Sequence, residues 1–146
     1  MRTKYLLPPI MLCCALQSHA DDSVIGYIKT VNGNAELISD GNANKAEVGS
    51  AVRLGNVLQT GENGTLGVTF KDDTVMSVGP NTSLKIDEYL YAPAQGQLKL
   101  VANLMKGTLH YISGVIAKLK PEAIAVKTPS ATIGVRGTRF VVKAGD

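Results

Sequence analysis

The chain has 146 residues, with 15 Lys and Arg against 12 Asp and Glu, so its formal charge at pH 7 is +3. This length suits one ordinary domain and excludes a multidomain machine. Fifteen glycines, no Trp, 5% aromatic and 18% charged residues are typical of a turn-rich β protein and not of a coiled coil or a disordered tail.

The first 20 residues have the pattern of a secretory signal. Arg2 and Lys4 precede an apolar run from Tyr5 to Leu16, which is too short to span a bilayer as a mature helix. Ser18-His19-Ala20 then places small residues at the two positions that a signal peptidase inspects. We therefore predict a signal peptide over residues 1–20, cleaved after Ala20.

Both cysteines, Cys13 and Cys14, lie in this signal segment. Lipid attachment at either is the weaker alternative, because neither follows a small residue. Cleavage also removes Arg2 and Lys4, so residues 21–146 form a cysteine-free domain of charge +1. No later window holds 18 uninterrupted apolar residues, so we predict a periplasmic or secreted bacterial envelope protein with no membrane span after cleavage.

Short β-prone runs separated by Gly, Asn and Asp fill the region from Ser23 to Asp87. The runs are Val24–Val31, Ala35–Ile38, Val52–Leu58, Leu66–Lys71, Val75–Val78 and Leu84–Asp87. Several alternate between apolar and polar residues, as a strand with one buried face does. The sequence predicts a single all-β domain of short strands with little helix, built as a β-sandwich, a barrel or a β-solenoid.

The turns between these runs use residues that tolerate positive φ or bond their own backbone. They are Asn32-Gly33, Asp40-Gly41, Gly61-Glu62-Asn63-Gly64 and Asp72-Asp73. Such residues favour tight turns. We expect a hairpin across Asp72-Asp73, between Phe70 and Val75.

The segment from Leu98 to Leu119 fits two descriptions. Its apolar residues recur at spacings of three and four, as on one face of a helix, but Gly107 and Gly114 would then each cost about 1 kcal/mol inside that helix. Leu98-Lys99-Leu100 and residues 108–112 also alternate as strands do. We predict two strands around a turn at Lys106-Gly107, followed by a short helix within Ser113–Lys118 that Pro121 keeps from continuing.

The last stretch, Val126–Val142, changes its alternation midway. Ile133 and Val135 are odd-numbered, whereas Thr138, Phe140 and Val142 are even-numbered. One regular strand cannot send both sets to the same core. We predict a β-bulge at Arg136-Gly137, which absorbs one residue and turns Arg136 outward.

This stretch resembles the FecR-domain family, whose pattern ends in Thr-Pro, a short β-prone run and an Arg-Gly-Thr-x-Phe-x-Val strand. Thr128-Pro129 and Arg136–Val142 match it. Earlier landmarks of the pattern are echoed by Gly26-Tyr27-Ile28, Leu54–Gly61, Asp72-Asp73-Thr74 and Pro80-Asn81-Thr82. Two positions depart from it: Asn56 stands where the family usually has Asp, and Asp73 replaces a turn Gly, so those two turns are expected to be less tight.

The resemblance implies a sensor-type β domain of the periplasm, of the kind that receives a signal from an outer-membrane receptor. Transmembrane signalling itself is not carried over, because this sequence resembles only the periplasmic part. The candidate partner-binding or motif residues are Thr128, Pro129, Gly134, Arg136, Gly137, Thr138, Arg139 and Phe140.

In the family the Arg-Gly-Thr-x-Phe-x-Val strand is usually followed by a further strand, whereas here Asp146 soon ends the sequence. We expect either a truncated product or a last strand left as a free edge. A free edge offers unpaired N–H and C=O groups, a route to strand addition by a partner or to self-association.

Little in residues 21–146 supports catalysis. His110 is the only histidine there and no cysteine remains, which removes thiol chemistry and multi-histidine metal sites. We read His110 as an ordinary half-exposed strand residue. Two acidic pairs, Asp72-Asp73 and Asp87-Glu88, could act as acid and base or gather Ca²⁺ with Asn81, but turn chemistry explains them more simply. We assign no catalytic, cofactor or metal residue.

Basic residues crowd the C-terminal third: Lys118, Lys120, Lys127, Arg136, Arg139 and Lys143, against Glu122 and Asp146. Such a region attracts anionic surfaces, although a solvated edge that discourages aggregation would look the same. Nucleic acid is not expected, since stacking aromatics are few. We therefore predict a non-enzymatic module that binds a protein or an anionic envelope polymer. The alternatives are a structural subunit of the envelope and a carboxylate-dependent carbohydrate-active enzyme.

Overall fold

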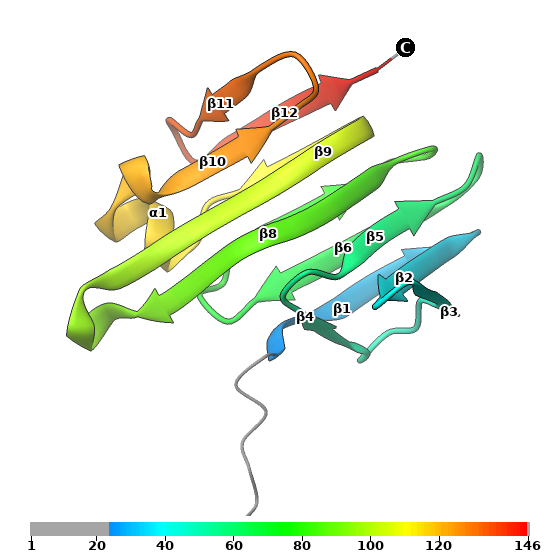
Figure 1. The fold of residues 1–146 in the computed structure, drawn as a ribbon, viewed down its shortest axis with the longest axis horizontal. Helices are drawn as coiled ribbons and strands as arrows, with labels where there is room; N and C mark the ends of the chain where they lie inside the picture. Colours follow the sequence, from blue (N-terminus) through cyan, green and yellow to red (C-terminus); the bar gives the residue numbers. More distant parts are fainter. Residues whose placement is uncertain (1–23, 146) are drawn as a thin grey trace, which may run out of the picture.

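The computed structural model describes residues 24–145, so the predicted signal peptide and its cleavage site lie outside the described residues. Twelve strands and a single five-residue α-helix make up this described part (Figure 1). The prediction of an all-β single domain with little helix is confirmed.

The strands are β1 (Val24–Asn32), β2 (Ala35–Ser39), β3 (Asn42–Lys45), β4 (Ala51–Arg53), β5 (Val57–Thr60), β6 (Thr65–Phe70), β7 (Val75–Val78), β8 (Ser83–Ala92), β9 (Gln97–Ile112), β10 (Ile124–Lys127), β11 (Thr132–Gly134) and β12 (Arg139–Ala144). The helix is α1 (Val115–Leu119), with short 3-10 turns η1 (Pro93–Gln95) and η2 (Pro121–Ala123). The helix expected within Ser113–Lys118 is confirmed at nearly the predicted place.

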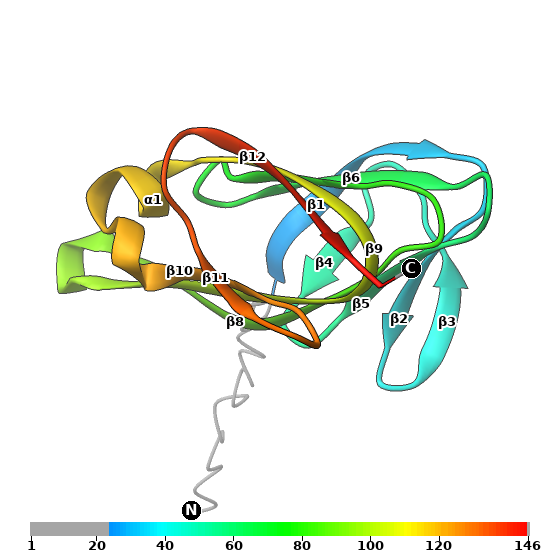
Figure 2. The same ribbon diagram turned by 90° about the horizontal axis from the view of Figure 1, so that it is seen from above.

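One curled sheet, folded over as a half-barrel, holds nine of these strands in the order β3-β2-β5-β8-β9-β7-β6-β1-β4. Strands β10 and β12 branch from it at β9, and β11 pairs with β10. Figure 2 shows the resulting two layers, with β1, β6 and β12 in one layer, β8, β10 and β11 in the other, and α1 at one end. The core between the layers is aliphatic, with Tyr111 and Phe70 as its largest fully buried side chains.

Strand β9 belongs to both layers. Its first half pairs with β8 on one side and with β10 on the other, whereas residues 107–112 pair with β12 and residues 109–112 with β7. The predicted turn at Lys106-Gly107 is therefore wrong. Gly107 adopts a φ of +96°, which bends the strand from one layer into the other without ending it.

The predicted strand Val52–Leu58 is also wrong, because the chain turns at residues 54–56 and separates β4 from β5. Gly55 has a φ of +85°, and the Asn56 side chain accepts a hydrogen bond from the Arg53 amide at 2.8 Å. Strand β3 was missed, since its residues Asn-Ala-Asn-Lys are all exposed and carry no alternation.

The alternation of the other strands is largely as predicted. Leu66, Val68 and Phe70 are buried on β6, and Leu84 and Ile86 are buried on β8. Register shifts between Ile86 and Glu88, so Asp87 is an extra residue and Tyr89 turns inward in its place. The expected hairpin across Asp72-Asp73 is confirmed by the pairing of β6 with β7.

The predicted bulge at Arg136-Gly137 is wrong. Strand β11 ends at Gly134 and pairs with β10, while β12 begins at Arg139 and pairs with β9. Residues 135–138 cross from one layer to the other (Figure 2). The change of alternation arises because the two apolar sets belong to different strands in different layers.

We predict that Gly107→Ala destabilises the fold by about 3 kcal/mol. A Cβ at residue 107 would overlap the side chain and Cα of buried Thr82, in a backbone conformation that alanine disfavours. Urea unfolding followed by circular dichroism measures the loss.

Two control variants separate the overlap from the backbone strain. Gly137→Ala has the same left-handed backbone (φ +95°) and nothing within 4 Å of the added Cβ, so it should cost about 1 kcal/mol. Gly134→Ala has neither the overlap nor the left-handed backbone, so its free energy of unfolding should lie within about 0.5 kcal/mol of the wild-type value. Equal losses for Gly107→Ala and Gly137→Ala would show that Thr82 does not restrict the bend.

Candidate interaction surface

The predicted motif residues Thr128 and Pro129 shape the turn between β10 and β11. The Thr128 amide donates to the Ala131 carbonyl at 2.8 Å, and the Thr128 hydroxyl accepts from the Ala131 amide at 3.1 Å. Pro129, with its fixed φ, suits the first central position of such a turn. These two residues therefore have a local structural role at the hairpin.

Gly137 and Thr138 lie in the segment that crosses between the layers, and Ser113 fixes that segment to the end of β9. The Ser113 amide donates to the Thr138 carbonyl at 2.9 Å, and the Ser113 hydroxyl donates to the Gly137 carbonyl at 2.9 Å. Arg136, just before them, is exposed.

Phe140 faces inward from β12. Its ring stacks on that of Tyr111, with centroids 4.6 Å apart and an interplanar angle of 23°. Arg139, next to it in the chain, is exposed, as strand alternation requires.

A groove of about 410 Å³ runs between β11 and β12, at the open end of the two layers. Three predicted residues line it, namely Gly134, Arg136 and Phe140, together with Ile133, Val141, Val142 and Lys143. Thr128 and Pro129 are not among these lining residues. Sequence reasoning missed Val141. The available signal was that Val141 is an apolar residue on the same, outward face of the strand as Arg139 and Lys143.

The groove is positively charged. From Gln97 to Ala144 the chain carries eight Lys and Arg and one acid, Glu122. Lys99 forms an ion pair with Glu88 at 3.0 Å, but within residues 24–145 Arg136, Arg139 and Lys143 have no carboxylate at ion-pair distance. These three cations are free to meet an anionic partner.

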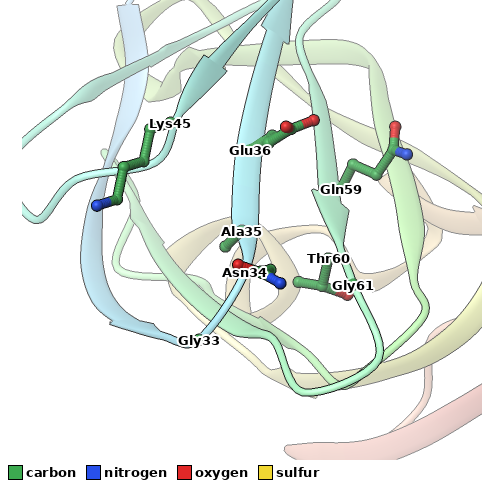
Figure 3. Close-up of a pocket in the computed structure, with 8 residues that line it drawn as sticks. All are labelled: Gly33, Asn34, Ala35, Glu36, Lys45, Gln59, Thr60 and Gly61. Carbon is green, nitrogen blue, oxygen red and sulfur yellow. The ribbon is translucent and has the colours of Figure 1, made fainter.

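A second hollow, of about 560 Å³, lies at the base of the β2–β3 hairpin and is lined in part by Asn34, Glu36, Lys45 and Gln59 (Figure 3). Glu36 and Gln59 extend to one side of β2, whereas the Lys45 amine points to the other. Because these polar groups do not converge and no aromatic ring lines the hollow, it lacks the arrangement of a small-molecule site.

The carboxylate of Asp72 is fully buried and holds three parts of the fold together. It accepts hydrogen bonds from the Tyr89 hydroxyl of β8 at 2.9 Å, the Thr74 hydroxyl at 2.6 Å and the Ile116 amide of α1 at 3.1 Å. The Asp72 carbonyl also accepts from the Val115 amide at 2.7 Å. Asp72 is thus a structural centre, and its burial keeps it from any substrate.

The remaining candidate groups are dispersed. Asp73 lies in the β6–β7 turn with a φ of +68°, where the family pattern has Gly; Asp87 lies 3.9 Å from Lys85. His110 is exposed on β9. Within residues 24–145 no three His, Cys, Asp or Glu side chains gather as metal ligands do.

A family model described as FecR protein matches residues 56–146. The chain belongs to the FecR family. The matched region runs from Asn56, just before β5, to the end of the chain, so it includes the groove and both strands that flank it. The Gly26-Tyr27-Ile28 landmark lies ahead of it. Comparisons with curated proteins and with solved structures gave no match.

FecR domains are envelope-associated sensor or regulatory modules without enzymatic activity. In this FecR-family chain, no helix of residues 24–145 is long and apolar enough to cross a membrane.

We predict that Asp72→Ala destabilises the domain by about 3 to 4 kcal/mol, because it leaves the buried donors around this carboxylate without their acceptor. Thermal and urea unfolding of the purified variant measure the loss. Asp73→Asn is the matched control: it changes the exposed neighbour to a residue that tolerates positive φ, and should shift stability by less than about 0.5 kcal/mol. A wild-type-like Asp72→Ala would contradict the structural role.

We also predict that stability falls as the pH rises above 10. Burial, and then the charge of Asp72, raise the pKa of Tyr89 above the ordinary value of 10.0, and burial also raises the pKa of Tyr111. Because both pKa values are higher in the folded protein, the unfolded chain ionises these phenols at a lower pH than the folded protein does. The free energy of unfolding should therefore drop by up to about 3 kcal/mol for each pH unit, and be unaffected by these groups below pH 10.

Tyr111→Phe provides the test of that slope. The Tyr111 hydroxyl is buried and has no hydrogen-bond partner of good geometry within the described residues, so its removal should cost little at pH 7. Urea unfolding of Tyr111→Phe at several pH values should show a shallower decline than the wild type, with the contribution of Tyr89 remaining. The same decline in both proteins would show that ionisation of Tyr111 does not contribute to the loss of stability at high pH.

Proposed function

We propose that this domain is a non-enzymatic, sensor-type binding module of the bacterial periplasm that recognises a protein or an anionic envelope polymer through its C-terminal end. The observation that carries the proposal is the groove between β11 and β12. It combines two free strand edges with Arg136 and Lys143 in its lining and Arg139 on the outer face of β12, and none of these three cations has a carboxylate partner within residues 24–145. Family membership supports a sensor or regulatory role. The signal-peptide pattern of residues 1–20 supports the periplasmic location.

The physical basis of recognition is twofold. Unpaired cations beside an apolar groove raise the local concentration of anionic partners by long-range attraction, which salt weakens. The apolar floor, formed by Ile133, Phe140 and Val142, then supplies short-range burial that salt does not weaken. The affinity of a partner that uses both the charges and the apolar floor should fall with added salt but should not be lost.

An assembly role is the second candidate, because the sheet has several free edges. Strands β3 and β4 are the two ends of the sheet order, whereas β11 and β12 end the two branches that leave it at β9. Free edges on different strands permit head-to-tail association of copies.

Removal of the groove charges tests the proposal. The variant Arg136→Gln/Arg139→Gln/Lys143→Gln should lose binding to immobilised lipopolysaccharide or to cross-linked periplasmic protein, with an effect of at least tenfold at low salt. Its control, Lys29→Gln/Lys45→Gln/Lys71→Gln, removes the same charge from exposed positions elsewhere and should bind as the wild type does. Equal behaviour of the two variants would refute recognition at this end.

A further inference from the structure

Strand β12 leaves three sets of backbone groups without a strand partner. The Ser113 amide donates to the Thr138 carbonyl, which makes 113 and 138 a hydrogen-bonded pair. In an antiparallel ladder such pairs recur at every second residue. The backbones of Phe140, Val142 and Ala144 therefore point toward β9, and those of Arg139, Val141 and Lys143 point away from it.

The partner strand confirms this assignment independently. Lys143 lies opposite Thr108. The backbone of Thr108 is turned the other way: its amide donates to the Thr82 hydroxyl at 3.0 Å and its carbonyl accepts from the Gly79 amide at 3.0 Å. Among the described strands β12 pairs with β9 alone, so the outward N–H and C=O groups form an open edge.

The side chains of β12 specify what could pair there. On the outer face lie Arg139, Val141 and Lys143, of which Val141 is 58% exposed. Directly opposite residues on one face of a sheet interact, and opposite charges stabilise the pair. An added strand therefore fits best with an acid, an apolar residue and an acid at alternate positions.

The groove determines the other face of the added strand. Phe140 and Val142 point from β12 toward the interior, and Ile133 faces the same groove from β11. The residues between the acids would lie over this apolar floor, so apolar side chains suit them.

We propose that β12 takes up, as an added strand, an extended segment of a partner protein with the pattern acid–apolar–apolar–apolar–acid. This inference rests on the proposed function and names the class of its partner. Backbone pairing along β12 supplies affinity, and the two charge pairs with Arg139 and Lys143 set register and selectivity.

A second copy of this chain is a poor occupant. In a twofold antiparallel pairing that uses all three outward residues, Val141 meets its counterpart and each Arg139 meets the other chain's Lys143, which repel. The other edge strands offer no acid either: β3 contains Lys45, β4 contains Arg53, and β11 carries no charge. The charges of the edges therefore oppose self-association and favour an acidic partner.

The test uses the full mature protein and three synthetic peptides. The peptide Thr-Glu-Ile-Val-Ile-Glu-Thr carries the proposed pattern, a second peptide has Lys in place of both Glu, and a third has Pro in place of the central Val. Amide hydrogen exchange and chemical shifts by NMR report binding at each residue, with peptide up to the millimolar range. We expect the Glu peptide to bind about tenfold more tightly than the Lys peptide, and the Pro peptide to lose binding because it cannot complete the ladder.

Amide protection distinguishes strand addition from charge attraction. The amides of Arg139, Val141 and Lys143 should exchange freely in the unbound protein and slow at least tenfold with the Glu peptide, while those of Phe140 and Val142, already bonded to β9, should change little. Binding without this protection would overturn strand addition and leave the proposed function standing. No binding of the Glu peptide at millimolar concentration would also overturn it.

Two variants complete the test. Arg139→Glu/Lys143→Glu should reverse the preference and bind the Lys peptide about tenfold more tightly than the Glu peptide. Arg139→Glu alone makes the twofold self-pairing complementary, so analytical ultracentrifugation should show a concentration-dependent dimer for this variant and a monomer for the wild type. A wild-type dimer that Val141→Pro abolishes would overturn the inference in favour of assembly.

Discussion

Strand β9 is the constraint on which the rest of this structure depends. It lies between β8 and β10 in one layer and between β7 and β12 in the other, so the two layers are halves of one sheet joined along its length. The bend that allows this occurs at Gly107, against Thr82. A side chain there would overlap Thr82 and strain the backbone, which would destabilise the bend that places β12 over the core.

The same strand explains where the open edge lies. Because the second half of β9 is already paired with β7 on one side, its other side is available to β12 alone. The crossing segment, fixed by Ser113, brings the chain from β11 to that side. The groove is thus a consequence of this crossing, because it is the space between β11, at the edge of one layer, and β12, at the edge of the other.

Much of this fold follows from local patterns, and the failures have physical causes. The β-prone runs predicted β6 and β7, and Asp72-Asp73 predicted the hairpin between them. Both predictions were correct because each signal depends only on residues close together in the sequence. Gly107 was read as a turn because a glycine within a strand pattern gives the same local signal whether the chain reverses or only bends. The distinction depends on Thr82, 25 residues earlier, which packs against the bend. Asp72 was read as a turn residue for a similar reason, since Tyr89 and Ile116, its distant partners, are not visible in the local sequence.

The candidate site was predicted in part, and its residues fall into two sets, one that packs inside the domain and one that faces outward. The terminal pattern Arg-Gly-Thr-x-Phe-x-Val places Phe140 and Val142 inside, where they pack on Tyr111 and the core. The two unspecified positions of this pattern are Arg139 and Val141, the residues that face outward on the free edge. The pattern thus describes how the strand is held in place and leaves unspecified the face that a partner would meet.

The shared strand also has a consequence for how the chain folds. Without β9, β1, β4, β6 and β7 can pair with one another, as can β2, β3, β5 and β8, but no strand pairing joins the two groups. Each group leaves apolar surface exposed until β9 pairs with both. A partly folded chain in which β9 is not yet in place is therefore the species most prone to aggregation.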